Sequence, residues 1–169
     1  MNSEVFEKYI INVPDFPKKG VVFKDISPLL SEKFDDVITA MGEEINWNNI
    51  DLVIGIESRG FILGSAMAIK FGKGFLPIRK KGKLPPPVIS EEYTLEYGTD
   101  ILEMRENKSE KRVLIVDDVL ATGGTLKAAL NLCKKNGFQV KGTAVLIDLK
   151  FLNNLSQELG NIHSVLAYE

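Results

Sequence analysis

Residues 113–125 read Val-Leu-Ile-Val-Asp-Asp-Val-Leu-Ala-Thr-Gly-Gly-Thr, and this stretch decides the fold. Its four leading apolar residues favour a strand that is buried on both faces and ends in two carboxylates. Apolar residues then recur at helical spacing over residues 126–132, so the glycine turn joins the end of a strand to the start of a helix. Such a junction binds anions, because the N–H groups of the first helical turn are free and Gly123 and Gly124 let a ligand approach the backbone.

Asp117 and Asp118 narrow the class of ligand. Two carboxylates would repel a bare phosphate, and they suit a ligand that also presents hydroxyls or carries a divalent cation. A receiver domain of a signalling pathway also has paired aspartates after a strand, but near the start of the domain and without a following Thr-Gly-Gly-Thr. The spacings of a P-loop and of a dinucleotide fold are both missing. The sequence therefore favours a site for a sugar phosphate. It favours this over a receiver domain, a P-loop or a dinucleotide fold, and over aspartates that are merely solvated beside an ordinary turn.

The composition is that of an ordinary soluble globular protein. Its 169 residues are 44% hydrophobic and 26% charged, which predicts a single domain over residues 1–169. A net charge of −2 argues against a general nucleic-acid or membrane-surface binder. Cys133 is the only cysteine, so a disulfide framework is excluded, and we expect it in the core. Residues 1–9 contain no apolar run, and the sequence predicts a cytoplasmic protein.

The hydrophobic pattern alternates between strands and helices. Helices are predicted over residues 33–45, 61–71 and 124–135, strands over residues 52–56, 74–78, 113–116 and 140–147, and a short helix and a strand at the carboxyl end. A loop over residues 79–87 precedes two antiparallel segments at 88–95 and 99–104. This α/β order predicts a mostly parallel sheet with helices on both faces. Ligands of such sheets bind at the carboxyl ends of the strands.

Two basic features lie at or near these ends. Arg59 follows the strand at 52–56, and its planar guanidinium suits a phosphate or pyrophosphate; a surface ion pair with Glu57 is the alternative. The loop at 79–87 has four basic residues in its first five positions and ends in three prolines. A charge run is usually a solvated face. Beside a phosphate-binding rim, however, this loop could close over a polyanionic substrate and exclude water.

Two further features favour recognition of a flat nitrogen heterocycle. Residues 16–28 are too rich in turn formers for a regular element, yet they hold Phe16 and Phe23. One of these rings is a candidate stacking platform, with core packing as the alternative. Glu96, if closure carries it inward, could hold or donate a proton on the heterocycle. His163 lies outside every motif, and we expect it to be structural.

Asp117-Asp118 followed by residues 121–125 resembles the phosphoribosyl-pyrophosphate motif of type I phosphoribosyltransferases. That motif alone indicates only the superfamily. Residues 20–28, residues 57–61 and the Leu-Glu-Tyr-Gly sequence at 95–98 are similar to the members that act on adenine, in the same order and with close to the same spacing. The resemblance covers nearly the whole chain.

This resemblance implies an open, mostly parallel twisted sheet with helices on both faces. It also implies a flexible antiparallel lid loop over residues 79–100 and an amino-terminal base-binding segment over residues 1–32. The family reaction converts adenine and phosphoribosyl pyrophosphate into AMP and pyrophosphate with Mg²⁺, through an oxocarbenium-like transition state. A homodimer without nucleic-acid or membrane partners is expected.

The resemblance also assigns roles to residues. The 5′-phosphate would be held by Ala121, Thr122, Gly123, Gly124 and Thr125. The ribose hydroxyls and the metal, directly or through water, would be held by Asp117 and Asp118. Pyrophosphate would be held by Arg59, Arg79, Lys80 and Lys83. Adenine would be held by Val22, Phe23, Lys24 and Leu149. Glu96, as partner of adenine N7, and Arg59 would be catalytic.

Three residues depart from the family pattern. Lys24 stands where arginine is common and Glu57 where aspartate is common. Pro86 replaces a frequent glycine, which predicts a stiffer lid or a different hinge. Two alternatives stay open: an enzyme of the same fold that uses another base, and a non-enzymatic regulator that senses phosphoribosyl pyrophosphate. The Phe23 segment argues against the first, and the chain length and charge against the second.

Overall fold

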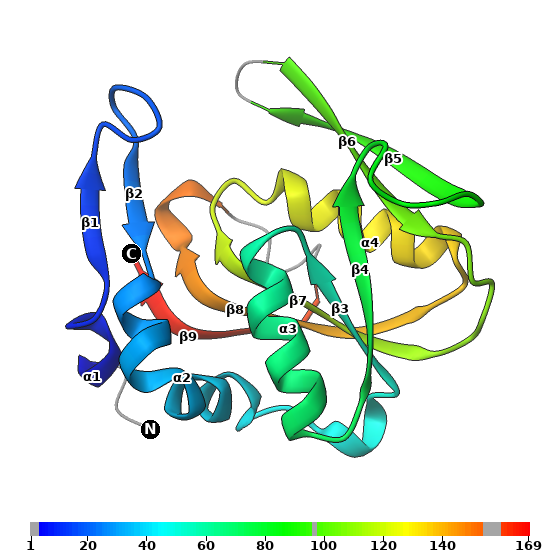
Figure 1. The fold of residues 1–169 in the computed structure, drawn as a ribbon, viewed down its shortest axis with the longest axis horizontal. Coiled ribbons are helices and arrows are strands. Elements are labelled where there is room, and N and C mark those ends of the chain that lie inside the picture. The colour runs from blue at the N-terminus through cyan, green and yellow to red at the C-terminus, as the bar shows by residue number, and fades with distance from the viewer. Residues whose placement is uncertain (1–3, 96–97, 154–159) are drawn as a thin grey trace.

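The structure is a computed structural model that describes residues 4–95, 98–153 and 160–169. Its main sheet has seven strands in the order β5-β6-β4-β3-β7-β8-β9 (Figure 1). The parallel strands are β3 (Leu52–Ile56), β4 (Gly74–Lys80), β7 (Arg112–Leu120), β8 (Gln139–Leu149) and β9 (Ile162–Tyr168). The hairpin of β5 (Val88–Leu95) and β6 (Gly98–Arg105) is antiparallel and joins the edge of β4.

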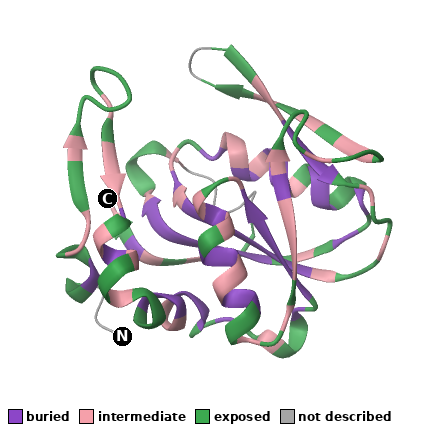
Figure 2. Cartoon of the chain, in the orientation of Figure 1, coloured by how far each residue is buried: buried purple, intermediate pink, exposed green. Residues whose placement is uncertain are grey.

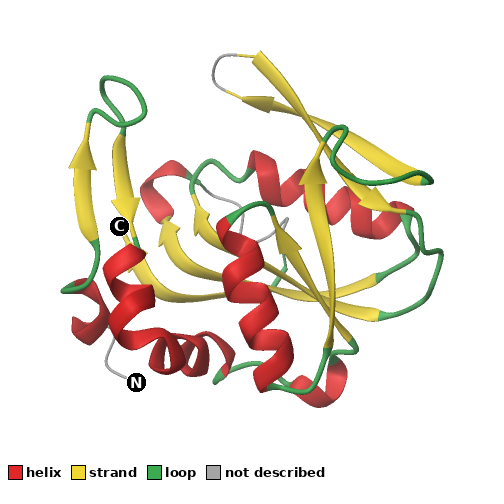
Figure 3. Ribbon diagram, in the orientation of Figure 1, coloured by secondary structure: helices red, strands yellow, loops and turns green. Residues whose placement is uncertain are grey.

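Helices cover both faces of this sheet (Figure 3). On one face, α2 (Ser27–Gly42) packs on β8 and β9, and α3 (Arg59–Lys70) packs on β3 and β7. On the other face, α4 (Gly124–Lys135) packs against β5 to β8. Short helical turns complete the described chain: α1 (Glu4–Glu7), η1 (Trp47–Asn49) and η2 (Lys150–Leu152). The predicted α/β class and two-sided covering are therefore confirmed.

Two hydrophobic cores lie on either side of the sheet. One gathers side chains of α2 and α3, and the other gathers side chains of α4 together with Ile78 and Met104. All five residues of β3 are buried between the two cores, as its continuous apolar run predicts (Figure 2). Cys133 is fully buried in the α4 core, as expected, and burial raises the pKa of its thiol to about 12.

Several predicted boundaries are wrong. Strand β7 does not end before the two carboxylates but runs through Asp117 and Asp118 to Leu120, because this part of the strand stays paired with β8. Helix α2 begins at Ser27 rather than residue 33, because Pro28 stands in its first turn; the helix has non-helical backbone angles at Lys33, where the prediction began. Strand β4 extends through Arg79 and Lys80, which were assigned to a loop. The extension exists because β4 pairs with β6, a contact between distant segments that local sequence does not reveal.

The amino-terminal segment also forms more regular structure than predicted. Strands β1 (Ile11–Pro14) and β2 (Val22–Asp25) pair as a separate antiparallel ribbon (Figure 1). Asp15 and Gly20 make the connection possible, because both adopt a positive φ and the Gly20 N–H donates to Asp15 Oδ1 at 2.7 Å. Across the described ranges, every helix is too short or too polar to cross a membrane.

Candidate active site

The carboxyl ends of β3, β4 and β7 surround a cavity of about 530 Å³. Its lining includes Arg59, Lys80, Lys83, Asp117, Asp118 and Thr125. These residues come from segments that are far apart in sequence, and the parallel order of the strands brings them to one edge of the sheet. The location agrees with the predicted position of a ligand in an α/β sheet.

The glycine turn forms an anion cradle at one side of the cavity. Gly123 has a φ of 84°, which favours glycine, and α4 begins at the next residue with its amino end beside the cavity. Ala121 and Thr125 line the cavity, whereas the Thr122 side chain is exposed to solvent. Gly124 lies against the hairpin: an added Cβ would come within 3.3 Å of the Thr94 carbonyl oxygen. The turn is therefore open toward the cavity and closed toward β5.

Asp117 and Asp118 are both buried at the end of β7. Burial, together with the neighbouring charge of Asp118, raises the pKa of Asp117 well above its ordinary value. The Asp118 N–H donates to Asp117 Oδ1 at 2.9 Å. Arg59 Nε lies 2.7 Å from Asp118 Oδ2, but without hydrogen-bond alignment, so this buried oxygen has no hydrogen-bond partner among the described residues.

This aspartate pair fits a divalent cation. A buried carboxylate oxygen without a hydrogen-bond partner, next to a second carboxylate, is the hard oxygen ligand that Mg²⁺ prefers. Within the described part of the chain, no third acidic, histidine or cysteine side chain joins the two in a metal-binding cluster. The protein would thus supply only part of the coordination shell, and the remaining ligands would come from substrate oxygens and water.

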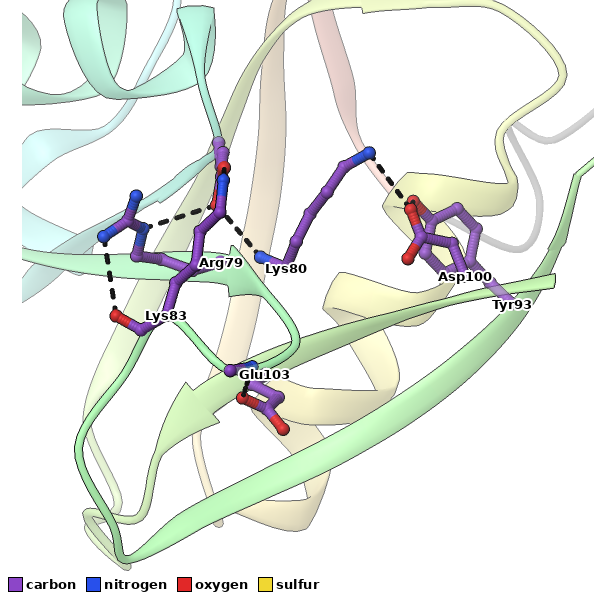
Figure 4. A network of polar contacts seen from close by, with 8 residues as sticks. Arg79, Lys80, Lys83, Tyr93, Asp100 and Glu103 are labelled. Atoms are coloured by element: carbon purple, nitrogen blue, oxygen red, sulfur yellow. Dashed lines mark hydrogen bonds and ion pairs between the residues drawn. The ribbon is translucent and has the colours of Figure 1, made fainter.

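Each basic side chain predicted to bind pyrophosphate is paired with a carboxylate, and the pairs of Arg79, Lys80 and Lys83 form part of the network in Figure 4. Lys80 Nζ lies 3.1 Å from Asp100 Oδ2. Arg79 Nε donates to Glu57 Oε2 at 3.3 Å, and Lys83 Nζ contacts the other oxygen of the same carboxylate. Arg79 therefore faces Glu57 and does not line the cavity. The positive charge of the site is therefore largely neutralised by these carboxylates.

Glu57 organises these cations. The expected alternative, an ion pair between Glu57 and Arg59, is not found: Glu57 pairs with Arg79 and Lys83, and Arg59 with Asp118. Burial opposes ionisation of Glu57, but hydrogen bonds from the Lys83 ammonium and from the Lys80 N–H outweigh it and lower the pKa of the carboxyl.

The amino-terminal ribbon reaches the site through Phe23. The Arg59 guanidinium carbon lies 4.6 Å from the centre of the Phe23 ring, a cation–π distance. Phe16 packs edge-on against Phe23 at 5.2 Å. Of the other predicted base-binding residues, Val22 is exposed and Lys24 lies over the Tyr168 ring. Leu149 packs against the core of the α2 face. Neither these three nor Phe23 line the cavity, which Phe23 reaches only through its contact with Arg59, and Glu96 lies outside the described residues.

Sequence reasoning missed Tyr93. This residue lines the cavity, its phenol donates to Asp100 Oδ2 at 3.3 Å, and its ring packs against the core under α4. The signal was the alternation of β5, in which Ile89, Glu91 and Tyr93 share the less exposed face of the strand. Asp100 was missed as well, because only the register of the hairpin sets it opposite Tyr93.

Gly60→Ala is expected to disturb the position of Arg59. A Cβ at Gly60 would lie 2.8 Å from the Val116 carbonyl oxygen, which is backbone and has little room to move. The substitution should lower the free energy of unfolding by about 1–3 kcal/mol and displace the start of α3. Denaturant unfolding and turnover measure the two effects. Gly74→Ala is the matched control, because its Cβ would meet only the tip of Leu52; equal losses in both variants would contradict the prediction.

Comparison with known proteins agrees with this geometry. Residues 26–158 match the family model of the phosphoribosyl transferase domain. The adenine phosphoribosyltransferase of Hydrogenovibrio crunogenus is 46% identical over 172 residues, covering 100% of this chain and 99% of its own. That of Thermotoga neapolitana is 51% identical, covering 96% and 98%. A crystal structure of the Rhodothermus marinus adenine phosphoribosyltransferase superposes with a TM-score of 0.91 at 44% identity, covering 99% and 98%. This chain therefore belongs to the phosphoribosyltransferase family, among the adenine phosphoribosyltransferases.

Proposed function

We propose that this protein transfers the phosphoribosyl group of phosphoribosyl pyrophosphate to adenine, giving AMP and pyrophosphate. The observation that carries the proposal is one cavity that joins the glycine cradle of α4, two buried aspartates and the side chains of Arg59, Lys80 and Lys83. These three groups match the three parts of phosphoribosyl pyrophosphate. The cradle suits the 5′-phosphate, the carboxylates suit the ribose hydroxyls, and the cations suit the diphosphate.

The donor is held from the cradle toward β4. The backbone of residues 121–125 and the hydroxyls of Thr122 and Thr125 bind the 5′-phosphate, while Asp117 and Asp118 bind the ribose hydroxyls. The same two carboxylates would hold Mg²⁺, directly or through water, and the bound ion would supply charge neutralisation to the diphosphate.

The leaving group is held by cations of β4 and α3. Arg59, Lys80 and Lys83 bind pyrophosphate from the lining of the cavity. A direct contact of Arg79 stays a prediction, because in this structure its guanidinium faces Glu57. Pyrophosphate binding therefore requires the cations to leave, or to share, their present carboxylate partners.

The base is recognised at the amino-terminal ribbon. Phe23 stacks on adenine, the backbone of Val22 and Lys24 reads its edge, and Leu149 packs on the other face of the ring. Glu96 holds N7. These assignments stay predictions from the family resemblance. Cleavage of the carbon–oxygen bond develops positive charge on the ribose and negative charge on pyrophosphate, so catalysis is positioning and electrostatic stabilisation, without a protein nucleophile.

We also infer the setting of the enzyme. A single domain over residues 1–169, with the base-binding segment at 1–32 and the lid at 79–100, would act as a cytoplasmic homodimer. Its partners would be adenine and phosphoribosyl pyrophosphate, not nucleic acids or membranes.

The proposed function is tested by the release of pyrophosphate from phosphoribosyl pyrophosphate in the presence of Mg²⁺. Adenine, hypoxanthine, guanine, xanthine and the pyrimidine bases are offered separately, and we expect release with adenine. Release with hypoxanthine but not with adenine would assign another base. No release with any base would favour a regulator that only binds the donor.

A further inference from the structure

Asp100 is a charged residue at the site that the proposed function does not use. It lies on β6, is part-buried, and does not line the cavity itself. Its carboxylate nevertheless holds Lys80, with 3.1 Å between Asp100 Oδ2 and Lys80 Nζ (Figure 4). The Lys80 side chain does line the cavity, and about half of it, 53%, is exposed. Asp100 thus occupies the ammonium group that a bound pyrophosphate would need.

Two other donors hold Asp100 in place. The Ile101 N–H donates to Oδ1 at 2.8 Å and the Tyr93 hydroxyl donates to Oδ2 at 3.3 Å. Tyr93 is itself fixed, because its ring packs against the α4 core. When Lys80 leaves, the carboxylate keeps two hydrogen bonds. Lys80 can therefore move from Asp100 to a phosphate without leaving the Asp100 carboxylate without hydrogen bonds.

The pair also favours a charged Lys80. The hydrogen bond and the charge of Asp100 outweigh the effect of burial and raise the pKa of the Lys80 ammonium. Lysine is protonated at neutral pH in any case, so the effect of the pair is to hold the ammonium in place and to neutralise its charge with a carboxylate.

We propose that Asp100 is a placeholder for the diphosphate: it holds Lys80 at the cavity and gives the ammonium up when pyrophosphate or phosphoribosyl pyrophosphate binds. The inference rests on the proposed function, because it deepens the role of Lys80 there. Its consequence is a weakened affinity for pyrophosphate, since the ligand must replace Asp100 and must also approach its negative charge. The residue is a positioning residue that limits retention of the product.

Asp100→Asn tests the proposal by a gain of binding. Asparagine keeps one oxygen that can accept from the Ile101 N–H, and its NH2 group can donate to the Tyr93 phenol oxygen, but it removes the charge that competes with pyrophosphate. Titration calorimetry with inorganic pyrophosphate and Mg²⁺ should show binding that is about three- to ten-fold tighter than in the wild type. The KM for phosphoribosyl pyrophosphate should fall in parallel, and the KM for adenine should not change. Loss of packing would not produce tighter binding.

Tyr93→Phe provides the second arm. Without the phenol hydroxyl, Asp100 has one donor fewer and should hold Lys80 more strongly, so pyrophosphate should bind more weakly. In the double variant with Asp100→Asn this penalty should shrink, because the competing carboxylate is gone. An undiminished penalty in the double variant would show that Tyr93 acts on the ligand without Asp100, and would overturn the placeholder mechanism.

Glu92→Gln is the matched control, since it removes one negative charge from an exposed position of the same hairpin. It should leave pyrophosphate binding unchanged. Unchanged or weaker binding in Asp100→Asn would overturn the proposal; if that variant does not fold, Asp100→Ser serves, with the same expected gain. Pyrophosphate binding is measured without turnover, so it is independent of the base panel. Normal adenine turnover without a gain in Asp100→Asn would reject the placeholder and leave the proposed function intact.

Discussion

Asp117→Asn is expected to make the protein more stable and almost inactive. Burial and the adjacent charge of Asp118 raise the pKa of the Asp117 carboxyl in the folded state above its unfolded value. The folded protein therefore binds this proton more tightly, and stability falls as the pH rises from the unfolded pKa toward the raised folded pKa. Above that window the full cost of a buried charge is present. Asparagine removes this cost and can still accept from the Asp118 N–H.

The expected gain is about 0.5–2 kcal/mol in the free energy of unfolding at pH 7–8. It should shrink as the pH falls toward 4, where the wild-type carboxyl is protonated as well. The kcat/KM for phosphoribosyl pyrophosphate should drop by about 100-fold or more, because the variant loses a charged ligand for the ribose hydroxyls and Mg²⁺. Stability and activity would move in opposite directions, as expected for strain that is kept at a functional site.

Thermal unfolding between pH 4 and 8 and pyrophosphate release with adenine measure the two effects. Asp51→Asn is a control of opposite sign. Hydrogen bonds from Arg112 lower the pKa of Asp51, so its contribution is present above the unfolded pKa and is lost as the pH falls. Asp51 lies before β3, at the other end of the strand from the cavity, so activity should be kept. A lower melting temperature for Asp117→Asn at pH 7–8 would contradict the prediction.

The parts of the site that local sequence specifies were predictable. Residues 113–125 combine a buried strand, two carboxylates and a glycine with positive φ, and each of these depends on neighbours in the chain. The same holds for β3, whose apolar run marks a strand buried on both faces. Only the extension of β7 past the carboxylates to Leu120 depends on pairing with β8. The end of a strand and the start of the next helix are close in sequence, so the anion cradle needs no tertiary information.

The features of the site that depend on pairing between distant segments could not be predicted from the sequence. Arg79 and Lys80 belong to a strand because β6 lies beside them, and β6 is separated from β4 in the sequence by β5. The partners of the charges follow from the same packing: Glu57 holds Arg79 and Lys83, while Arg59 turns to Asp118. Sequence indicates which side chains are charged at the rim. It does not indicate which of them neutralise one another.

Arg59→Ala is expected to cause a loss of activity at least as large as that of Asp117→Asn. The Arg59 side chain lies between Phe23, over whose ring its guanidinium carbon sits at 4.6 Å, and Asp118, whose Oδ2 is 2.7 Å from Nε. It therefore joins the base-binding ribbon, the aspartate pair and the diphosphate side of the cavity. Removing it should lower kcat/KM for phosphoribosyl pyrophosphate by about 100- to 1000-fold, since one preorganised charge is lost where the leaving group develops negative charge.

Arg59→Lys should restore little of this activity. An ammonium has neither the planar surface that lies over Phe23 nor the fork that binds two phosphate oxygens. Pyrophosphate release and direct pyrophosphate binding measure the loss. Arg112→Ala is the control, because it removes an arginine that is also paired with an aspartate, Asp51, but away from the cavity. Wild-type pyrophosphate affinity in Arg59→Ala would remove Arg59 from the binding of the leaving group.

The stability of Arg59→Ala separates its structural role from its role in catalysis. Without the guanidinium, the buried Asp117 and Asp118 lose the cation that is paired with Asp118. The partly exposed arginine softens the cost, so the variant should lose about 1–2 kcal/mol in the free energy of unfolding. Adding Asp118→Asn should recover most of this stability, because it removes the carboxylate that Arg59 neutralised, but it should recover no activity. The missing activity follows from Asp118 as well, which is itself proposed to bind the ribose hydroxyls and Mg²⁺, so stability is the readout of the double variant. A double variant no more stable than Arg59→Ala would contradict the structural role of the Arg59–Asp118 pair.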